Sequence, residues 1–160
     1  MKLWLISVGK PGRVLEAAIA EYESRVQRYW TYETIEVKEE RAGRGQTPDA
    51  IRDAEAERLL KRAPKGAELI ALTRTGDAWS SERLSRHIQK AAVQASPGIA
   101  FVIGGALGLG DAVLRDAQRR MRLSTCTFPH DLARLVLAEQ LYRAGTIARG
   151  EPYHKGSGAE

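Results

Sequence analysis

Glycines and hydroxyl-bearing residues are concentrated in the last third of the chain. The glycines directly follow one predicted strand, and the hydroxyl-bearing residues form another. The apolar run 99–104 opens into a turn that holds Gly104, Gly105, Gly108 and Gly110. A short polar strand, Leu-Ser-Thr-Cys-Thr, is predicted at residues 123–127. Glycines allow a backbone to approach a ligand closely, and α/β sheets bind small molecules at the carboxyl ends of their strands. These two strand ends therefore predict a ligand-binding crevice rich in backbone polar groups.

The glycine turn matches no common phosphate-binding motif. No Gly-Lys-Ser/Thr follows it, so it is not a P-loop. Its order is G-G-x-x-G-x-G after the fourth predicted strand, whereas a dinucleotide fingerprint is G-x-G-x-x-G after the first. A tight strand-to-helix turn without any ligand explains the glycines about as well, so the motif alone leaves both interpretations open.

Two histidines are candidates for proton transfer near this crevice. His130 comes at the predicted start of the last helix, and imidazole titrates near neutral pH, which suits a general base. Its alternative role is that of a helix-start residue bonded to nearby backbone. His154 lies in the tail beside Tyr153 and Lys155, where it could contact a polyanion or belong to a frayed terminus.

The single cysteine, Cys126, is predicted on a buried strand, where packing is its expected role. One cysteine provides neither an internal disulfide nor a cluster for zinc, so we expect no metal. Apolar residues make up 43% of the 160 residues and charged residues 28%, which is typical of a globular domain. No apolar run approaches the ~18 residues of a membrane span. We therefore expect a cytoplasmic protein without membrane contact.

The net charge of +5 is compatible with a nucleic-acid partner but does not demonstrate one. The densest basic cluster, Arg119, Arg120 and Arg122, lies just before the predicted polar strand. Solvated surface charge is the plainer explanation for each of these arginines.

Strand and helix patterns alternate to the end of the chain. Strands are predicted at residues 3–8, 34–37, 67–72, 99–104 and 123–127, with a turn at 73–77. Repeated strand–helix units predict an α/β fold with a mostly parallel sheet of about five strands and helices on both faces. No linker divides the chain, so residues 1–160 are predicted to form one domain with 152–160 as its tail.

The last predicted helix, residues 131–148, has an apolar surface broader than one stripe. Such a helix is expected to be buried on two sides, by the sheet and by a second subunit, which predicts a homodimer. Within this helix, Glu139 is expected to pair with Arg143 one turn further on.

Taken together, these segments resemble the SPOUT superfamily of knotted methyltransferases, and within it the bacterial enzymes that methylate N3 of a pseudouridine in 23S ribosomal RNA. The matching segments span almost the whole chain: residues 1–3, 8–10, 20–22, 70–72, 101–105, 108–109, 127–130, 134–143 and 150–155. They include Thr-Phe-Pro-His at 127–130 and Pro-Tyr-His-Lys at 152–155. Residues 156–160 extend beyond the usual end of the family.

The resemblance implies S-adenosylmethionine as the methyl donor, bound between three loops. The residues that it assigns to the donor are Leu72, Gly104, Gly105, Gly108, Leu123, Ser124, Thr125, Cys126, Thr127 and Phe128. It also implies a homodimer, a C-terminal trefoil knot and a substrate within the assembled ribosome, and it requires no metal.

Ribosomal RNA has to be held by basic and aromatic groups, which could come from both subunits. The candidates are Arg122, Arg143, Tyr153, His154 and Lys155. Two other functions fit the same features: a non-catalytic ribosome- or RNA-binding module on this fold, and a small α/β enzyme with a flavin or nucleotide cofactor. A donor-binding assay distinguishes the binding module from a methyltransferase, and the absorbance spectrum of the purified protein distinguishes an enzyme with a flavin or nucleotide cofactor from one.

Overall fold

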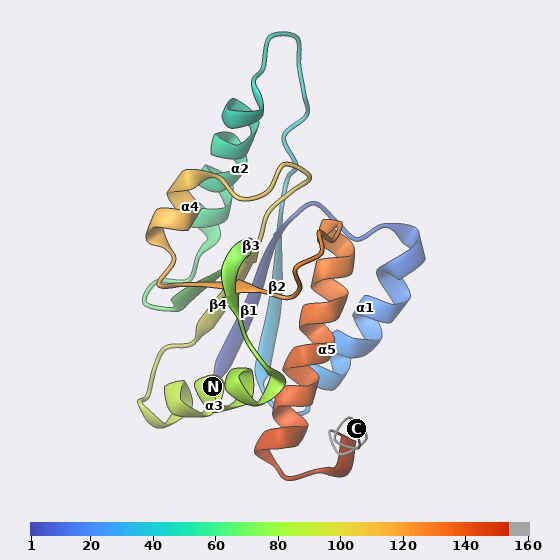
Figure 1. Cartoon of the computed structure of the whole chain (residues 1–160), viewed down its shortest axis with the longest axis vertical. Coiled ribbons are helices and arrows are strands. Elements are labelled where there is room, and N and C mark those ends of the chain that lie inside the picture. Colours follow the sequence, from blue (N-terminus) through green and yellow to red (C-terminus); the bar gives the residue numbers. More distant parts are fainter. Residues whose placement is uncertain (154–160) are drawn as a thin grey trace.

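The structure, a computed structural model, describes residues 1–153, in which five strands alternate with five helices (Figure 1). In chain order the elements are β1 (Lys2–Val8), α1 (Arg13–Val26), β2 (Thr31–Val37), α2 (Pro48–Arg62), β3 (Glu68–Ala78), α3 (Ser81–Val93), β4 (Ile99–Ile103), α4 (Asp111–Asp116), β5 (Arg119–Arg122) and α5 (His130–Ala148). The strands form one sheet in the order β2-β1-β4-β3-β5, and every neighbouring pair is parallel. The predicted α/β fold with a parallel sheet is thereby confirmed.

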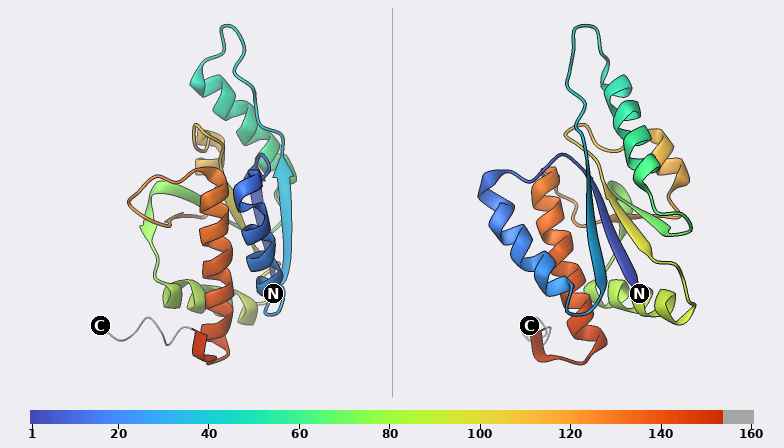
Figure 2. Two further views of the ribbon diagram at one scale, coloured as in Figure 1. Left: turned by 90° about the vertical axis from the view of Figure 1, so that its right-hand side faces the viewer. Right: turned by 180° about the vertical axis from the view of Figure 1, so that it is seen from behind.

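Helices cover both faces of the sheet, as predicted (Figure 2), and each face buries its own apolar cluster. Leu5 and Phe101 point toward α1, α3 and α5, whereas their neighbours Ile6 and Val102 point toward α2 and α4. Because both faces are covered, β4 is buried along its whole length and reads Ile-Ala-Phe-Val-Ile. Parallel strands point toward the same edge of the sheet, and there residues 72–75 of β3 meet the segments that follow β4 and β5.

The third strand is longer than predicted, and the segment 73–77 is not a free turn. β3 continues to Ala78 and pairs with β5, but its register shifts, so that both Leu72 and Asp77 lie opposite Met121. The residues between them bulge out of the ladder, and a bulge beside a binding site re-aims side chains. Gly76 permits this close pairing, since a Cβ there would lie 2.6 Å from the backbone nitrogen of Met121. The predicted turn was wrong because pairing with a distant strand is not visible in the local pattern.

The prediction of a fifth strand at residues 123–127 was also wrong. β5 is formed by Arg119–Arg122 at the edge of the sheet, and an edge strand has an open side that accommodates charged side chains. In the segment after it, the Ser124 hydroxyl accepts a hydrogen bond from the backbone nitrogen of Cys126 at 3.0 Å. Such a local bond competes with strand pairing. Cys126 is therefore exposed in a loop rather than packed on a buried strand.

Arg134 ties α5 to α1 and β2 through a buried ion cluster. The residue is only 6% exposed, and its guanidinium contacts Glu23 at 2.8 Å and Glu36 at 2.7 Å. Burial acts to lower the pKa of this guanidinium, but the hydrogen bonds to both carboxylates outweigh burial and raise the pKa above its ordinary value. Arg134 is therefore charged and paired in the folded chain.

We expect Arg134→Met to lower the free energy of unfolding by about 3–5 kcal/mol, because two carboxylates are left close together without their counter-charge. Urea denaturation at a fixed protein concentration measures the loss. The control is Arg25→Met, which breaks an exposed pair with Glu21 within α1 and is expected to cost much less. Equal losses in the two variants would contradict a special role for the buried cluster.

Candidate active site

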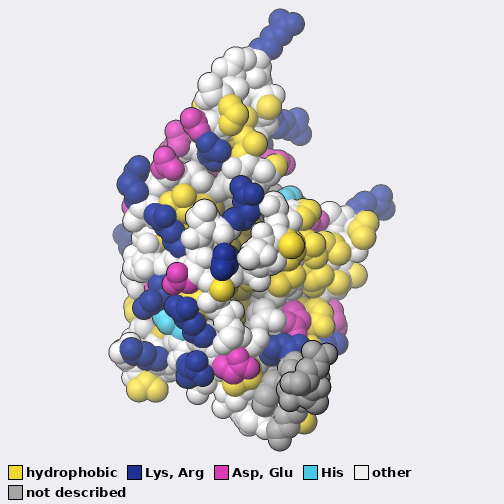
Figure 3. Space-filling model, viewed as in Figure 1, with side chains coloured by type: hydrophobic (Ala, Val, Ile, Leu, Met, Phe, Trp, Pro, Cys, Tyr) yellow, Lys and Arg dark blue, Asp and Glu magenta, His cyan; other side chains and the backbone are white. Residues whose placement is uncertain are grey.

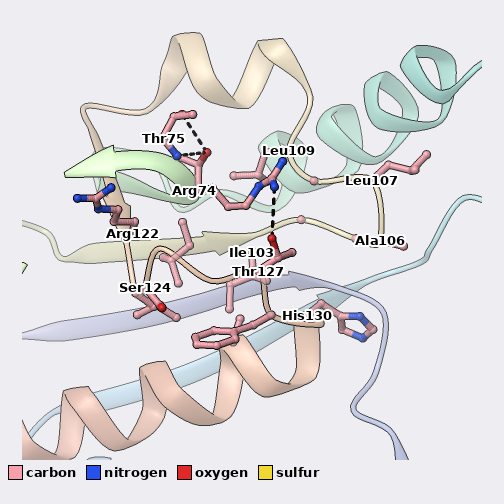
Figure 4. A pocket seen from close by; sticks show the side chains of 18 of the residues that line it. Arg74, Thr75, Ile103, Ala106, Leu107, Leu109, Arg122, Ser124, Thr127 and His130 are labelled. Carbon is pink, nitrogen blue, oxygen red and sulfur yellow. Dashed lines mark hydrogen bonds between the residues drawn. The ribbon is translucent and has the colours of Figure 1, made fainter. Parts of the chain in front are cut away.

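A cavity of about 430 Å³ opens beside the bulge of β3 and the carboxyl ends of β4 and β5 (Figure 4). Residues 72–75 form one wall, residues 103–109 a second, and the segment that runs from Arg122 to Phe128 a third. The first turn of α5 contributes His130 and Ala133, and α2 adds one side chain. A cavity of this size is in the range of small-molecule sites. Its walls are the three segments from which the sequence predicted donor contacts.

The structure brings most of the predicted donor residues together. Those that line the cavity are Leu72, Gly104, Gly105, Gly108, Leu123, Ser124, Cys126, Thr127 and Phe128. Thr125 is exposed in the same loop and does not line the cavity. Convergence of three separate segments supports one shared ligand site. That this ligand is the methyl donor stays a prediction at this point.

The glycine turn is closed by its own backbone. The backbone nitrogen of Gly108 donates to the carbonyl oxygen of Gly105 at 3.0 Å, and Gly108 has a φ of 83°. Gly104 has no room for a side chain, because a Cβ would lie 2.6 Å from the carbonyl carbon of Gly108. The sequence suggested that glycine here admits a ligand, whereas the structure shows that Gly104 is required by the shape of the turn itself.

A buried carboxylate supports this turn from the α2 side. Glu55 is only 3% exposed, and a Cβ on Gly105 would lie 2.8 Å from its Oε2. Glu55 Oε1 accepts a hydrogen bond from the backbone nitrogen of Glu40 at 3.0 Å, while Oε2 has no hydrogen-bond partner within residues 1–153. Burial raises the pKa of the Glu55 carboxyl. The sequence did not mark this residue, because one glutamate in a highly charged helix resembles any surface carboxylate.

His130 lies at the rim of the cavity, where its ring faces the segment after β1 (Figure 4). Its Nε2 is 3.3 Å from the carbonyl oxygen of Lys10. A carbonyl oxygen only accepts, so Nε2 carries the hydrogen in this contact, and Nδ1 of the neutral ring is left to accept a proton. His130 therefore makes the hydrogen bond to backbone that was expected as its alternative role. Its role as a general base stays a prediction.

Sequence reasoning missed two arginines of the site, Arg52 and Arg74. Arg74 comes from the bulge of β3, and its guanidinium donates to Thr127 Oγ1 at 3.3 Å. Arg52 pairs with Asp49 one turn earlier in α2. The position of Arg74 just after a predicted strand was a usable signal, but the bulge that turns it toward the cavity was not predictable. Arg122, which was predicted to contact RNA, lines the same cavity.

Arg143, in the second half of α5, and Tyr153, beyond its C-terminal end, are two further predicted RNA contacts, and they lie far from the first turn of α5, which lines the cavity. Arg143 is roughly 20 Å along the helix from His130, at about 1.5 Å per residue. It pairs with Glu139 as predicted, at 2.7 Å, and the Tyr153 hydroxyl donates to the same carboxylate oxygen at 3.1 Å. The remaining candidates lie outside the described residues: His154 and Lys155.

Within residues 1–153, no three His, Cys, Asp or Glu side chains lie close enough together to hold a metal ion. No helix in this part of the chain combines the length and the apolar character needed to cross a bilayer. The lining of the cavity instead offers backbone groups, hydroxyls, guanidinium groups and one imidazole.

The fold and the cavity together define a class of protein. A parallel α/β sheet whose strand ends enclose a glycine- and hydroxyl-lined cavity is the arrangement of an enzyme that binds a small cosubstrate. The family profile described as "Predicted SPOUT methyltransferase" matches residues 1–154. The chain belongs to the SPOUT methyltransferase family, and membership implies a knotted C-terminal segment. The resemblance predicted from the sequence is thereby confirmed.

Relatives cover the chain almost from end to end. A protein of Gemmatimonas aurantiaca is 47% identical over 156 residues, which cover 97% of this chain and 100% of the relative. A protein of Bacillus pumilus is 44% identical over 159 residues, with coverages of 97% and 100%. A third, from Geobacter metallireducens, is 42% identical over 155 residues, with coverages of 96% and 99%. All three are named "Ribosomal RNA large subunit methyltransferase H".

Proposed function

We propose that this methyltransferase transfers a methyl group from S-adenosylmethionine to N3 of a pseudouridine in the 23S RNA of the assembled bacterial ribosome. The observation that carries the proposal is the cavity, whose three walls are the segments that the family resemblance assigns to the donor. The names of the relatives support large-subunit ribosomal RNA as the acceptor. The target atom comes from the family resemblance. Such a substrate would make the enzyme cytoplasmic.

The cavity suits this donor in size and chemistry. Leu72, Ile103 and Leu123 offer apolar contacts to a flat purine, while the glycine backbone and the hydroxyls of Ser124 and Thr127 offer hydrogen bonds. When bound, S-adenosylmethionine supplies a methyl group on a positively charged sulfur. The protein contributes alignment of the two reactants and exclusion of water.

The acceptor nitrogen carries a proton that has to leave during the reaction. Among the described residues, His130 is the imidazole at the cavity, and its Nδ1 is the atom that would take this proton. His154 is the second predicted base, and its place in the tail is outside the described residues. Direct loss of the proton to solvent is the alternative to both.

The outer side of α5 favours a homodimer. Leu132 and Val136 are half-buried on this side of the helix and belong to neither apolar cluster of the described chain. Figure 3 shows apolar side chains gathered over the region of α5 and α1. A second copy on this face would cover them. It would also offer a way for Arg143 and Tyr153, which lie far from their own cavity, to reach the cavity of a partner.

We expect light scattering to give twice the chain mass of 17.6 kDa, and Val136→Glu to reduce it to one chain mass, because a charge would be buried in an apolar contact. Methylation is expected to fall with the dimer. The control is Val93→Glu, since Val93 of α3 is 87% exposed and its replacement leaves α5 untouched. A stable wild-type monomer that is active at micromolar concentration would refute the dimer.

Mass-spectrometric mapping of ribosomal RNA from a deletion strain tests the function directly. We expect one methyl group to be missing from one 23S fragment, and the pseudouridine in that fragment to react at N3 with a carbodiimide. The wild-type gene should restore the methyl group, and a gene carrying Gly104→Ala should not. An unchanged methylation pattern in the deletion strain would overturn the proposal.

A further inference from the structure

The charge of the cavity does not match its proposed donor. Three arginines line the cavity, Arg52, Arg74 and Arg122, and within the described residues no carboxylate does. S-adenosylmethionine has one carboxylate but two positive groups, an ammonium and a sulfonium, so its net charge is positive. Like charges in a partly enclosed site repel, and a site lined by one sign of charge attracts the opposite sign. The arginines therefore suit a second, anionic ligand.

Two of the three arginines lack a counter-charge in the part of the chain that the structure describes. Arg52 is neutralised by Asp49. Arg74 is exposed, and its bond is to the neutral hydroxyl of Thr127 at 3.3 Å. Arg122 is half-buried, and although its backbone lies opposite Ala78 in the strand ladder, its guanidinium makes no hydrogen bond or ion pair with any residue of 1–153. Arg74 and Arg122 are thus free to bind an anion.

The fold positions these two side chains on neighbouring strands. Arg74 sits on the bulge of β3, which Gly76 permits, and Arg122 ends β5 opposite Ala78 of the same strand pair. Figure 4 shows Arg74 extended across the cavity toward Thr127, with Arg122 on the side near Ser124. Both side chains therefore start from the edge of the cavity that β3 and β5 form, and the Arg74 guanidinium reaches Thr127 on the far side.

The basic surface continues outward from this edge along β5. A second hollow of about 260 Å³ shares Thr75 with the first and is lined by Arg119, Arg120 and one carboxylate residue, Asp77, which pairs with Arg83. Arg119 is held by Glu68 at 2.6 Å, and Arg120 donates to the carbonyl oxygen of Leu114 at 2.9 Å. Figure 3 shows Lys and Arg side chains spread over this face of the molecule. Regularly spaced phosphates of a single RNA strand suit such a path.

We propose that Arg74 and Arg122 bind the phosphates next to the target nucleotide, and that Arg119 and Arg120 guide the RNA strand onward along the edge of β5. This inference rests on the proposed function and deepens it. A guanidinium can donate two parallel hydrogen bonds to a phosphate. Such backbone contacts hold the strand in register while one base enters the cavity.

The test compares Arg74→Gln and Arg122→Gln with a matched control, Arg62→Gln, which removes an exposed charge in the last turn of α2. Methylation of purified ribosomal particles gives KM and kcat, and calorimetry gives the affinity for S-adenosylmethionine. We expect each test variant to raise KM for the particles about tenfold or more. The slope of log affinity against log salt should fall by about 0.7 for each lost phosphate contact. Donor affinity should stay the same or increase, and the control should resemble the wild type.

The outcomes distinguish a failure of the proposed phosphate contacts from a failure of the proposed function. An unchanged KM and salt slope in both variants, beside an active wild type, would overturn the phosphate contacts alone. A loss of donor affinity in either variant would also overturn them, because that arginine would then bind the carboxylate of S-adenosylmethionine. A wild-type protein that methylates no ribosomal particle would instead overturn the proposed function.

Discussion

Replacing Gly104 with alanine is expected to weaken the binding of S-adenosylmethionine by at least about a hundredfold, in a protein that stays folded. The added Cβ would lie 2.6 Å from the carbonyl carbon of Gly108 and 2.8 Å from the backbone nitrogen of Leu109. Both neighbours are backbone atoms, which cannot rotate away as the end of a side chain can, so the turn has to move. This turn is one wall of the proposed donor site, and a shift of about 1 Å in a positioning group is enough for such a loss.

Calorimetry measures the donor affinity, and circular dichroism measures the fold. The matched control is Gly43→Ala, the same chemical change in the loop after β2, where the new Cβ would have the Gln46 side chain nearby at 3.4 Å. Wild-type donor affinity in Gly104→Ala would remove this turn from the donor site. A loss of helical signal would mean that Gly104 acts on folding instead.

The glycine turn shows how far the sequence could predict this site. Glycines after an apolar strand indicated unusual backbone at the edge of a sheet, and the structure places that backbone in a cavity wall. The reason for each glycine was not predictable, because it depends on what folding brings alongside. Gly104 faces the backbone of Gly108, whereas Gly105 faces a carboxylate from α2, an element far away in the sequence.

The fold was predicted well where side-chain pattern decides it and poorly at the sheet edge. The strand β4 is apolar and buried at every position, so its position was predictable. β5 consists of Arg-Arg-Met-Arg, and only its place beside β3 makes it a strand. The bulge that turns Arg74 toward the cavity depends on the same pairing. For this reason the sequence predicted the donor loops but missed Arg74.

Deleting residues 152–160 is expected to abolish RNA methylation while donor binding and the fold stay nearly unchanged. Tyr153 lies against Arg143, whose guanidinium is 4.9 Å from the ring centroid. Arg143 is in the second half of α5 and Tyr153 beyond its end, whereas the cavity of the same chain is lined by the first turn. An aromatic ring with a cation suits stacking on a base and pairing with phosphate. The cut spares Glu151, which accepts a hydrogen bond from Tyr29, so the end of α5 keeps that anchor.

The expected fall in methylation is at least about a hundredfold, since an acceptor that is not held in place reacts through few productive encounters. A shorter deletion, of residues 156–160 alone, is the matched control, because it leaves Pro-Tyr-His-Lys in place and should be fully active. Methylation of ribosomal particles and calorimetry with S-adenosylmethionine are measured on both proteins. Full activity without residues 152–160 would refute the RNA-contact role of the tail. Loss of donor binding would show instead that the tail closes the donor site, which would then extend beyond the three walls described above.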